Sequence, residues 1–464
     1  MKTLIAFLLT IITFGAFAQK PRVFVLTDIE NEPDDAMSFV RFLTYANQFD
    51  IEGIVATTSC WQRTKTAEWR LHEITEAYGK VRDNLEKHEK GFPPEANIHS
   101  IIKKGLPVFG QLGLGKGKDS EGSDWLLKMM LKPDSRPLYI QAWGGTNVLA
   151  QALYKLKNTK KQVEIDRIIA KLRVYTISDQ DDTGPWIRKN FKNLFYIVSP
   201  GYEENGGGQY HYATWTGISG DIFHGRFMGA DTALVRNTML DEHVRKNHGP
   251  LGEKYPKIDF LMEGDSPSFM GLITNGLNSP ENPNYGGWGG RYELYIPQFK
   301  KYMYEPESRP IWTNTEDEVY SDITKSHHTS TQATIWRWRK AYQNDFFARM
   351  DWTIAKSYAD ANHPPIVSLN HPNEIKVKSG EKVILSGKAS DPDNNSMTYN
   401  WLYYKEVGTL TASRFVLGNT KNQEINFIAP IVNAPKTMHF ICEVTDNGTP
   451  NLTRYQRVIV IINP

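Results

Sequence analysis

Apolar and polar positions alternate in two different ways along the chain. Between about residues 21 and 361, short apolar runs rich in β-branched side chains alternate with longer runs of helical periodicity. The runs predicted as strands are residues 22–27, 51–58, 106–109, 138–142, 173–177 and 194–198. Strands separated by helices in this way predict βαβ units, and therefore an α/β fold with a mainly parallel sheet and helices on both faces.

The stretches between these runs carry the helical pattern. Predicted helices cover residues 34–48, 64–87, 146–156, 164–172 and 183–191, and further on residues 231–240, 269–276 and 332–348. After residue 202 the pattern is interrupted by loops rich in Gly and aromatic residues. We interpret this second half as part of the same α/β domain, with long loops that contribute to its functional site.

The pattern changes after His363-Pro364-Pro365, which is typical of a linker. The chain continues as short alternating runs separated by turn-forming clusters, at residues 366–369, 381–387, 397–403, 424–428, 438–445 and 454–462. About 100 residues of this kind predict an all-β Ig-like sandwich, with Trp401 on a central strand. The expected domains are therefore residues 19–362 and 363–464.

The N-terminus predicts export. Met1-Lys2 is followed by an almost wholly apolar run, residues 4–14, and then by Ala16-Phe17-Ala18, a small-x-small cleavage pattern. Residues 1–18 are therefore expected to be a signal peptide cleaved near Ala18, which makes the mature protein secreted or periplasmic. A transmembrane anchor is the alternative, but the apolar run is shorter than the roughly 17–25 residues of a spanning helix. We expect no membrane insertion of the mature chain.

Composition excludes some classes of partner. The chain has 54 Lys and Arg against 52 Asp and Glu, so it lacks the positive charge of a nucleic-acid-binding protein. Its two cysteines, Cys60 and Cys442, fall in different predicted domains, so no disulfide framework is expected. Many aromatic residues lie in polar loops, among them Trp215 and Trp288. Such rings suit the apolar faces of sugars, or equally the packing of loops and interfaces. Nothing in the sequence specifies an oligomeric state.

Five acidic residues crowd the junction between the first predicted strand and the first predicted helix. They are Asp28, Glu30, Glu32, Asp34 and Asp35. Capping of the helix would explain one or two of them, but Asp28 and Glu30 precede the helix. Ligands of a doubly wound sheet bind beyond the carboxyl ends of its strands, so this junction is a candidate site. A hard cation with oxygen ligands, Ca²⁺ before Mg²⁺ in an exported protein, would relieve the repulsion.

These acids do not have the spacing of an EF-hand loop, because the sixth position is not Gly and the twelfth is not Glu. The stretch from Asp28 to Asp35 instead resembles the Asp-x-Asp-x-x-x-Asp-Asp motif of nucleoside hydrolases at three of its four acids. Residues 53–58, 142–147 and 264–267 resemble, in order, the second strand, the Gly-Gly-x-Thr-Asn loop and the late metal-ligating Asp of that family. The blocks 115–125 and 285–292 are more similar to a divergent exported branch that is described as cellulose-binding and has an Ig-like C-terminal domain.

The resemblance implies a role for each matching residue. The metal ligands would be Glu30, Asp35, the carbonyl of Ala142, and Asp265. Glu30 stands where the family has the Asp that is both ligand and base, so Glu30 and Asp28 are the implied catalytic residues. Contacts to substrate are implied or expected for Asp34, Gln62, Trp143, Asn147, Trp215, Glu263 and Trp288.

Chemistry at an anomeric carbon fits this set of residues. Carboxylates stabilise developing oxocarbenium character, and a metal ion activates water. The acid that protonates the leaving group stays open among Asp179, Asp181, Asp182, Glu203, Glu204 and Glu263. We expect a secreted Ca²⁺-dependent hydrolase of O- or N-glycosidic bonds, acting on extracytoplasmic glycosides or fragments of plant polysaccharide. The alternative is a non-catalytic cellulose- or polysaccharide-binding protein, which the Glu30 substitution and the sandwich domain favour.

Overall fold

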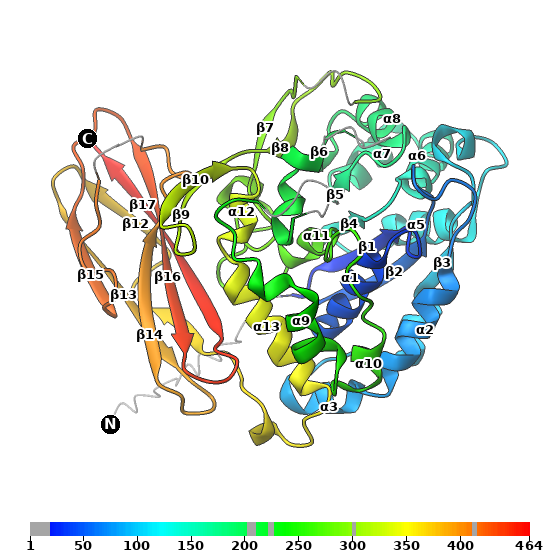
Figure 1. Ribbon diagram of the computed structural model, residues 1–464. Helices are drawn as coiled ribbons and strands as arrows, with labels where there is room; N and C mark the ends of the chain where they lie inside the picture. The colour runs from blue at the N-terminus through cyan, green and yellow to red at the C-terminus, as the bar shows by residue number, and fades with distance from the viewer. Residues whose placement is uncertain (1–18, 202–209, 221–226, 299–302, 411–414) are drawn as a thin grey trace, which may run out of the picture.

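The computed structural model describes residues 19–201, 210–220, 227–298, 303–410 and 415–464. The predicted signal peptide, residues 1–18, lies outside these ranges, as do two of the candidate acids, Glu203 and Glu204. Among the described residues, no helix is both long and apolar enough to span a bilayer. An α/β part and an all-β part lie side by side, as Figure 1 shows.

The α/β part is built on one sheet of eight strands. In spatial order these are β3 (Ile102–Lys104), β2 (Asp50–Ala56), β1 (Arg22–Thr27), β4 (Leu138–Ala142), β5 (Leu172–Ser178), β6 (Phe195–Ser199), β8 (Ile311–Asn314) and β7 (Tyr292–Tyr295). All neighbouring strands are parallel except β7 and β8. The predicted fold class, a mainly parallel sheet, is therefore confirmed.

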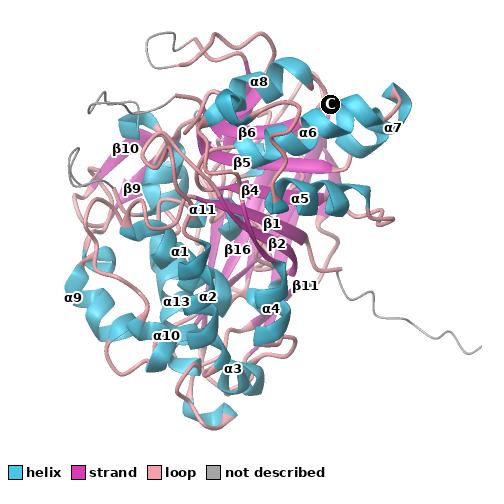
Figure 2. Cartoon of the chain, turned by 90° about the vertical axis from the view of Figure 1, so that its right-hand side faces the viewer, coloured by secondary structure: helices cyan, strands magenta, loops and turns pink. Residues whose placement is uncertain are grey.

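Alternation along β1 creates the two faces of this sheet. Val23 and Val25 belong to the core on one face, whereas Phe24 and Leu26 belong to the core on the other. The first core includes side chains of α1 (Pro33–Thr44), α2 (Glu68–Gly79), α3 (Arg82–His88), α4 (Glu95–Ile101), α9 (Asn237–Leu240), α10 (Gly249–Glu253), α11 (Ser266–Met270), α12 (Ala333–Trp336) and α13 (Arg339–Trp352). The second core includes side chains of α5 (Glu121–Leu131), α6 (Asn147–Thr159), α7 (Gln162–Ile169) and α8 (Thr183–Asn190). Helices thus cover both faces (Figure 2).

The strand order places the functional site. The chain adds β2 and β3 on one side of β1 and then crosses to the other side for β4, so the order reverses between β1 and β4. The loops after two such strands diverge and leave a crevice at their carboxyl ends. β1 ends at Thr27, directly before the acidic stretch, and β4 ends at Ala142, directly before Trp143.

Three predicted elements differ in the structure. Residues 106–109 form a loop, because the carbonyls of Leu106 and Val108 accept hydrogen bonds from the Asn147 side chain rather than from a neighbouring strand. The predicted helix 64–87 is divided into α2 and α3 after Gly79. The predicted helix 269–276 is short, and α11 ends at Met270 before Gly271. The hairpin of β9 (Asp317–Ser321) and β10 (Ser326–Ser330) was not expected from the sequence.

The C-terminal part consists of two packed sheets, as predicted. One contains β11 (Ile366–Leu369), β13 (Lys382–Ser390) and β15 (Glu424–Ile428), and the other contains β12 (Glu374–Lys378), β17 (Thr453–Asn463), β16 (Lys436–Asp446) and β14 (Met397–Tyr403). Side chains of both sheets form one core. Trp401 is buried in that core but lies on β14, an edge strand, so its expected central place was wrong. Cys60 and Cys442 are both free thiols.

Buried polar contacts join the two parts. The carboxylate of Asp317 on β9 accepts hydrogen bonds from Arg291 (2.7 Å), Arg337 (2.8 Å) and the Tyr404 hydroxyl of the sandwich (2.6 Å). On α13, Asp345 pairs with Arg454 of β17 at 2.6 Å. The sandwich is therefore docked on the α/β part through contacts that a simple linker would not make.

Candidate functional site

Three carboxylates meet at the carboxyl edge of the sheet. Asp34 and Asp35 lie in the first turn of α1, and Asp265 is the residue that precedes α11. One oxygen from each lies within 4.8 Å of the other two, and all three residues are buried. Pro33 occupies the first position of α1, where its missing N–H and fixed φ favour a helix start. The acidic residues therefore enter the first turn, where the helix dipole favours negative charge.

A fourth carboxylate, Asp28, completes the group. It follows β1, is only 2% exposed, and interacts with Asp34. A Cβ on Gly144 would lie 2.6 Å from Asp28 Oδ1, so the first Gly of the Gly-Gly pair makes room for this carboxylate. The Thr27 hydroxyl donates a hydrogen bond to Asp35. We call Asp28, Asp34, Asp35 and Asp265 the carboxylate cluster.

The cluster has no cationic counterpart among the described residues: no Lys or Arg forms a salt bridge with any of its four members there. Burial raises the pKa of Asp28 to about 7, with the charge of Asp34 as a further cause. Burial raises the pKa of Asp34 to about 6. The pKa values of Asp35 and Asp265 are raised well above the ordinary value, by burial first and then by the neighbouring carboxylates.

The cluster fits a hard divalent cation. Asp28 Oδ2 and Asp265 Oδ2 are buried and have no hydrogen-bond partner among the described residues, which is costly unless a ligand satisfies them. Carboxylate oxygens are the ligands that Ca²⁺ and Mg²⁺ prefer. The donor chemistry, the missing cationic partner and the unsatisfied oxygens all point to a metal-binding centre.

Two predicted site acids lie outside the cluster. Glu30 has a positive φ of 71°, is exposed, and pairs with Arg70 on α2 at 3.1 Å. Glu263 is completely buried, but its carboxylate is already satisfied by Arg41 (Nη2–Oε1, 3.1 Å), Tyr255 (2.5 Å) and Ser266 (2.8 Å). The structure therefore does not bring Glu30 or Glu263 to the point where the other acids meet.

The predicted aromatic contacts differ in position. Trp143 is fully buried between helices and donates its indole N–H to Ser268 at 2.9 Å. Trp288 is fully buried against Tyr455 of the sandwich, so it serves the interface. Neither ring is presented to a sugar, contrary to expectation, because each completes a core. Trp215 is also buried, but it lies beside Gly264 and therefore next to the cluster.

The residues that were predicted to make polar contacts with the substrate or the metal also differ in their distance from the cluster. Gln62 is buried beside the cluster and donates hydrogen bonds to the carbonyls of Asp28 (3.1 Å) and Ile29 (3.3 Å). Asn147 donates to the carbonyls of Leu106 and Val108, so its amide holds the 106–108 loop. Ala142 pairs with Leu26 at the end of β4, beside the last residues of β1.

The comparisons with known proteins agree with this geometry. Residues 22–292 match the family model described as cellulose-binding Sde182, nucleoside hydrolase-like domain. The chain belongs to the Sde182 family. Residues 382–462 match the model of the C-terminal domain of the cellulose-binding protein Sde0182. A solved nucleoside hydrolase-related protein from Saccharophagus degradans, described as associated with carbohydrate metabolism, is 33% identical, with a TM-score of 0.79 over 96% of this chain and 100% of that one.

More distant structures add little to the Sde182 assignment. The effector protein XOO4466 is 8% identical with a TM-score of 0.34, over 64% of this chain and 88% of that one. The type III effector XopQ, solved with adenosine diphosphate ribose, is 8% identical with a TM-score of 0.33, over 68% and 93%. These scores are too low to carry an argument. No curated protein matches the chain.

Asp181 is a structural part of this Sde182-family site whose place the sequence left open. Its buried carboxylate accepts hydrogen bonds from the Thr183 amide (2.9 Å) and the Asn147 amide (3.1 Å), and burial raises its pKa to about 6. A Cβ on Gly145 would lie 2.5 Å from Asp181 Oδ2, which explains the second Gly of the pair. Asp179 pairs with Arg188 at 2.8 Å, and Asp182 accepts from the Gln111 amide at 2.8 Å.

Sequence reasoning missed two residues beside the cluster. The Ser59 hydroxyl accepts hydrogen bonds from the amides of Trp61 and Gln62, both at 3.1 Å, and also interacts with Asp28. Gln180 is buried and donates to the carbonyl of Trp143 at 2.6 Å. The signal that pointed toward Ser59 was its place directly after the Thr57-Thr58 step; no sequence pattern distinguished Gln180.

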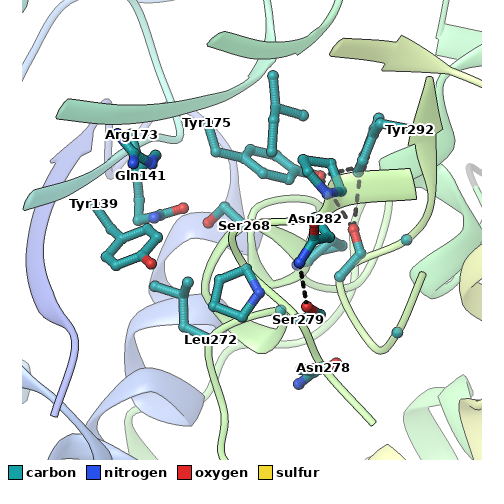
Figure 3. A pocket seen from close by; sticks show the side chains of 18 of the residues that line it. Tyr139, Gln141, Arg173, Tyr175, Ser268, Leu272, Asn278, Ser279, Asn282 and Tyr292 are labelled. Carbon is teal, nitrogen blue, oxygen red and sulfur yellow. Dashed lines mark hydrogen bonds between the residues drawn. The ribbon is translucent and has the colours of Figure 1, made fainter. Parts of the chain in front are cut away.

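A separate cavity of about 60 Å³ lies between the sheet and residues 267–292 (Figure 3). Tyr139, Gln141 and Tyr175 line it from β4 and β5, and none of the four cluster residues does. The volume suffices for a few water molecules but is far below the roughly 300–1,000 Å³ of a ligand pocket. The carboxylate cluster, not this cavity, is therefore the candidate functional site.

Proposed function

We propose that the protein is an exported, Ca²⁺-dependent hydrolase of O- or N-glycosidic bonds that acts on glycosides or fragments of plant polysaccharide. The observation that carries this proposal is the cluster of four buried carboxylates, which has no cationic partner among the described residues and lies where the strand order reverses. Membership of a cellulose-binding, nucleoside hydrolase-like family supports a carbohydrate as ligand.

Asp34, Asp35 and Asp265 would hold the cation, since their oxygens already converge. A Ca²⁺ ion there would supply Lewis acidity toward a water molecule and toward the hydroxyl groups of a sugar. Ala142 remains the proposed source of a main-chain ligand, because it ends β4 beside β1. Ca²⁺ is favoured over Mg²⁺ because it tolerates irregular sets of carboxylate and carbonyl oxygens.

Asp28 is the proposed proton acceptor. Its Oδ2 has no hydrogen-bond partner among the described residues, and it lies beside the carboxylates that would hold the cation, so it is placed to accept a proton from a water molecule there. The carboxylates around the anomeric carbon would stabilise positive charge as the glycosidic bond breaks. Gln62 Oε1, whose amide nitrogen is held against the carbonyls of Asp28 and Ile29, would accept a hydrogen bond from a sugar hydroxyl.

The position of Glu30 favours a second candidate function. Because Glu30 pairs with Arg70 at the surface, the acid that replaces the family's base does not reach the cluster. A protein that binds a carbohydrate through the same metal centre without cleaving it would have no need of that base. We therefore keep non-catalytic binding of cellulose or a related polysaccharide as the alternative.

Turnover with and without metal tests the proposal. The full mature chain is assayed on aryl-glycosides, nucleosides and cello-oligosaccharides in Ca²⁺ and after treatment with EGTA. We expect hydrolysis of at least one substrate, its loss in EGTA and its recovery with Ca²⁺. The variant Asp28→Asn should lower kcat by roughly 10²–10⁴-fold, the usual contribution of a general base.

Asp259→Asn is the matched control, because Asp259 is an exposed carboxylate in the same domain and outside the cluster. It should retain full activity. If Ca²⁺ binds but no substrate is cleaved, the hydrolase proposal fails and the binding protein remains. Loss of cellulose binding in Asp265→Asn would then place the carbohydrate at the cluster.

A further inference from the structure

An aromatic side chain marks the surface beside the carboxylate cluster. Trp61 is 41% exposed, although its neighbour Gln62 is only 3% exposed and contacts the Asp28 carbonyl. Ser59 Oγ accepts the amide hydrogens of both residues, and the Cys60 amide donates to the Gln180 carbonyl at 2.6 Å. This turn is therefore fixed to the site on one side and presents Trp61 to solvent on the other.

A run of aromatic rings connects Trp61 to the cluster. The Trp61 side chain lies close enough to the Tyr210 hydroxyl to interact with it. Tyr210 packs edge-on against Trp215, with ring centroids 5.0 Å apart and planes at 71°. A Cβ on Gly264 would lie 2.9 Å both from the Trp215 ring and from Asp34 Oδ2. Three aromatic side chains, Trp215, Tyr210 and Trp61, thus follow one another from Asp34 to the surface, and Trp61 is the outermost of them.

Several buried hydrogen-bonding groups beside the carboxylate cluster are unsatisfied in the part of the chain that the structure describes. Gln62 Oε1 and Gln180 Oε1 are buried without a hydrogen-bond partner among the described residues, and these two oxygens are not among the proposed metal ligands. The Trp215 indole N–H likewise has no partner there. Two free acceptors and one donor, beside the carboxylates that would hold the cation, are complementary to a ring that carries several hydroxyl groups. Because all these atoms are buried, the chain of a polysaccharide cannot pass across them.

We propose that the site receives a terminal sugar ring, with Gln180 as a further hydroxyl acceptor, and that Trp61 is the platform for the group bonded to that ring. The ligand is then the end of a glycan or a small glycoside, not the interior of a polymer. This inference deepens the proposed function and rests on the same site, but it concerns binding and does not require cleavage.

The sandwich offers no competing platform in its described part. Its exposed large apolar side chains are Ile366, Ile384, Val416, Ile428 and Ile431, all of them aliphatic. Flat aromatic rings are the side chains that pair with the apolar face of a sugar, and the exposed Trp residues belong to the α/β part. The geometry therefore favours recognition of a chain end by the α/β part over adhesion of the sandwich to a crystalline face.

Tryptophan fluorescence of the full mature chain in Ca²⁺ tests this inference. The probes are glucose, xylose, mannose and arabinose, each compared with its β-linked disaccharide or, for arabinose, the α-linked one. We expect a disaccharide to bind more tightly than its monosaccharide. Trp61→Ala should weaken disaccharide binding about tenfold, near 1.4 kcal/mol, and leave monosaccharide binding unchanged. Trp61→Phe should lose less, because it keeps a ring.

Trp69→Ala is the matched control, since Trp69 on α2 is 57% exposed. It should bind like the wild type. For the hexoses glucose and mannose, the trisaccharide with its non-reducing end blocked as a 4,6-ethylidene acetal should lose binding, because two hydroxyl groups are removed from the buried ring. The inference is overturned if no probe binds, if the blocked sugar binds equally well, or if Trp61→Ala and Trp69→Ala behave alike.

The outcomes separate this inference from the proposed function. Binding that depends on Trp61 without any turnover would retain the terminal-sugar site and reject the hydrolase. Ca²⁺-dependent turnover that Trp61→Ala leaves unchanged, for leaving groups of every size, would retain the hydrolase and reject the platform.

Discussion

At the carboxyl edge of the α/β sheet, four aspartates are buried with no cationic partner in the part of the chain that the structure describes. By contrast, Asp317 and Asp345, buried between the two parts of the molecule, each contact two arginines. Burial alone would raise the pKa of Asp317, but Arg337 and Arg291 outweigh it and hold the pKa below its ordinary value. Arg454 and Arg349 have the same effect on Asp345. The fold satisfies its structural acids internally and leaves the cluster for a ligand.

The opposite pKa shifts follow from the partners, not from depth. Asp265 is 1% exposed and Asp345 is 2% exposed, so desolvation acts on both. What differs is the sign of the neighbouring charges. The comparison teaches that burial of a carboxylate is not itself evidence for a site; burial without a compensating cation is.

The largest expected effect comes from removing a paired acid. Asp317→Ala removes the buried carboxylate that Arg291 and Arg337 share. Among the described carboxylates, it leaves them only Glu293, which is exposed, and Glu406 at 3.9 Å. We therefore expect the free energy of unfolding to fall by about 3–5 kcal/mol. Urea unfolding at neutral pH measures the change. Asp322→Ala, an exposed acid in the turn after β9, is the control and should change little. Equal losses in both variants would contradict a special role for the buried pair.

A pH series sharpens the comparison at Asp345. Because its pKa is lowered in the folded state, its ionised form stabilises the fold above about pH 4, and this stabilisation is lost as the pH falls through the folded pKa. Asp345→Asn should therefore be less stable than the wild type at pH 7, by about 3 kcal/mol, and the gap should narrow toward pH 3. Chemical unfolding at several pH values checks this. A gap that stays constant would show that packing, not charge, is lost.

The sequence predicted the sheet better than it predicted the site. The two faces of β1 follow from the alternation of side chains along the strand. The proximity of its carboxyl end to that of β4 follows from the order of strands and helices along the chain. Both can be predicted from neighbouring residues. The side chain of Glu30 could not be placed in this way. Its turn has a positive φ, and its partner, Arg70, belongs to a helix whose orientation depends on packing.

Contacts between residues far apart in the sequence explain the other differences between the predicted and the observed site. Glu263 looked available because it stands two residues before Asp265, but Arg41 of α1, far away in the sequence, satisfies it. Trp288 lay in a Gly-rich stretch that resembled a loop, but it is buried against Tyr342 of α13 and Tyr455 of the sandwich. Such contacts connect segments whose proximity no local pattern encodes.

A smaller effect, of opposite sign to that at Asp317, is expected within the cluster. In EGTA, Asp265→Asn removes one of several repelling buried charges, so the variant should be more stable than the wild type. Added Ca²⁺ should reverse the order. At one hundred times its Kd, a bound ion stabilises the wild type by about 2.7 kcal/mol, and the variant should gain much less. Thermal unfolding with and without Ca²⁺ measures both, and a destabilised variant in EGTA would show that the acid already has a partner.

The smallest effect is expected at the acid that the structure separates from the cluster. Glu30→Gln removes a partly exposed ion pair with Arg70, which is worth less than about 1 kcal/mol in stability. Arg70 also pairs with Glu73, so it keeps a partner in the variant. If Glu30 is neither ligand nor base, Ca²⁺ affinity from calorimetry and turnover of any cleaved glycoside should both stay within about twofold of the wild type, near 0.4 kcal/mol. A loss of turnover by a factor of roughly 10² or more with stability unchanged would instead return Glu30 to the role of base, and would require its side chain to leave Arg70 when substrate binds.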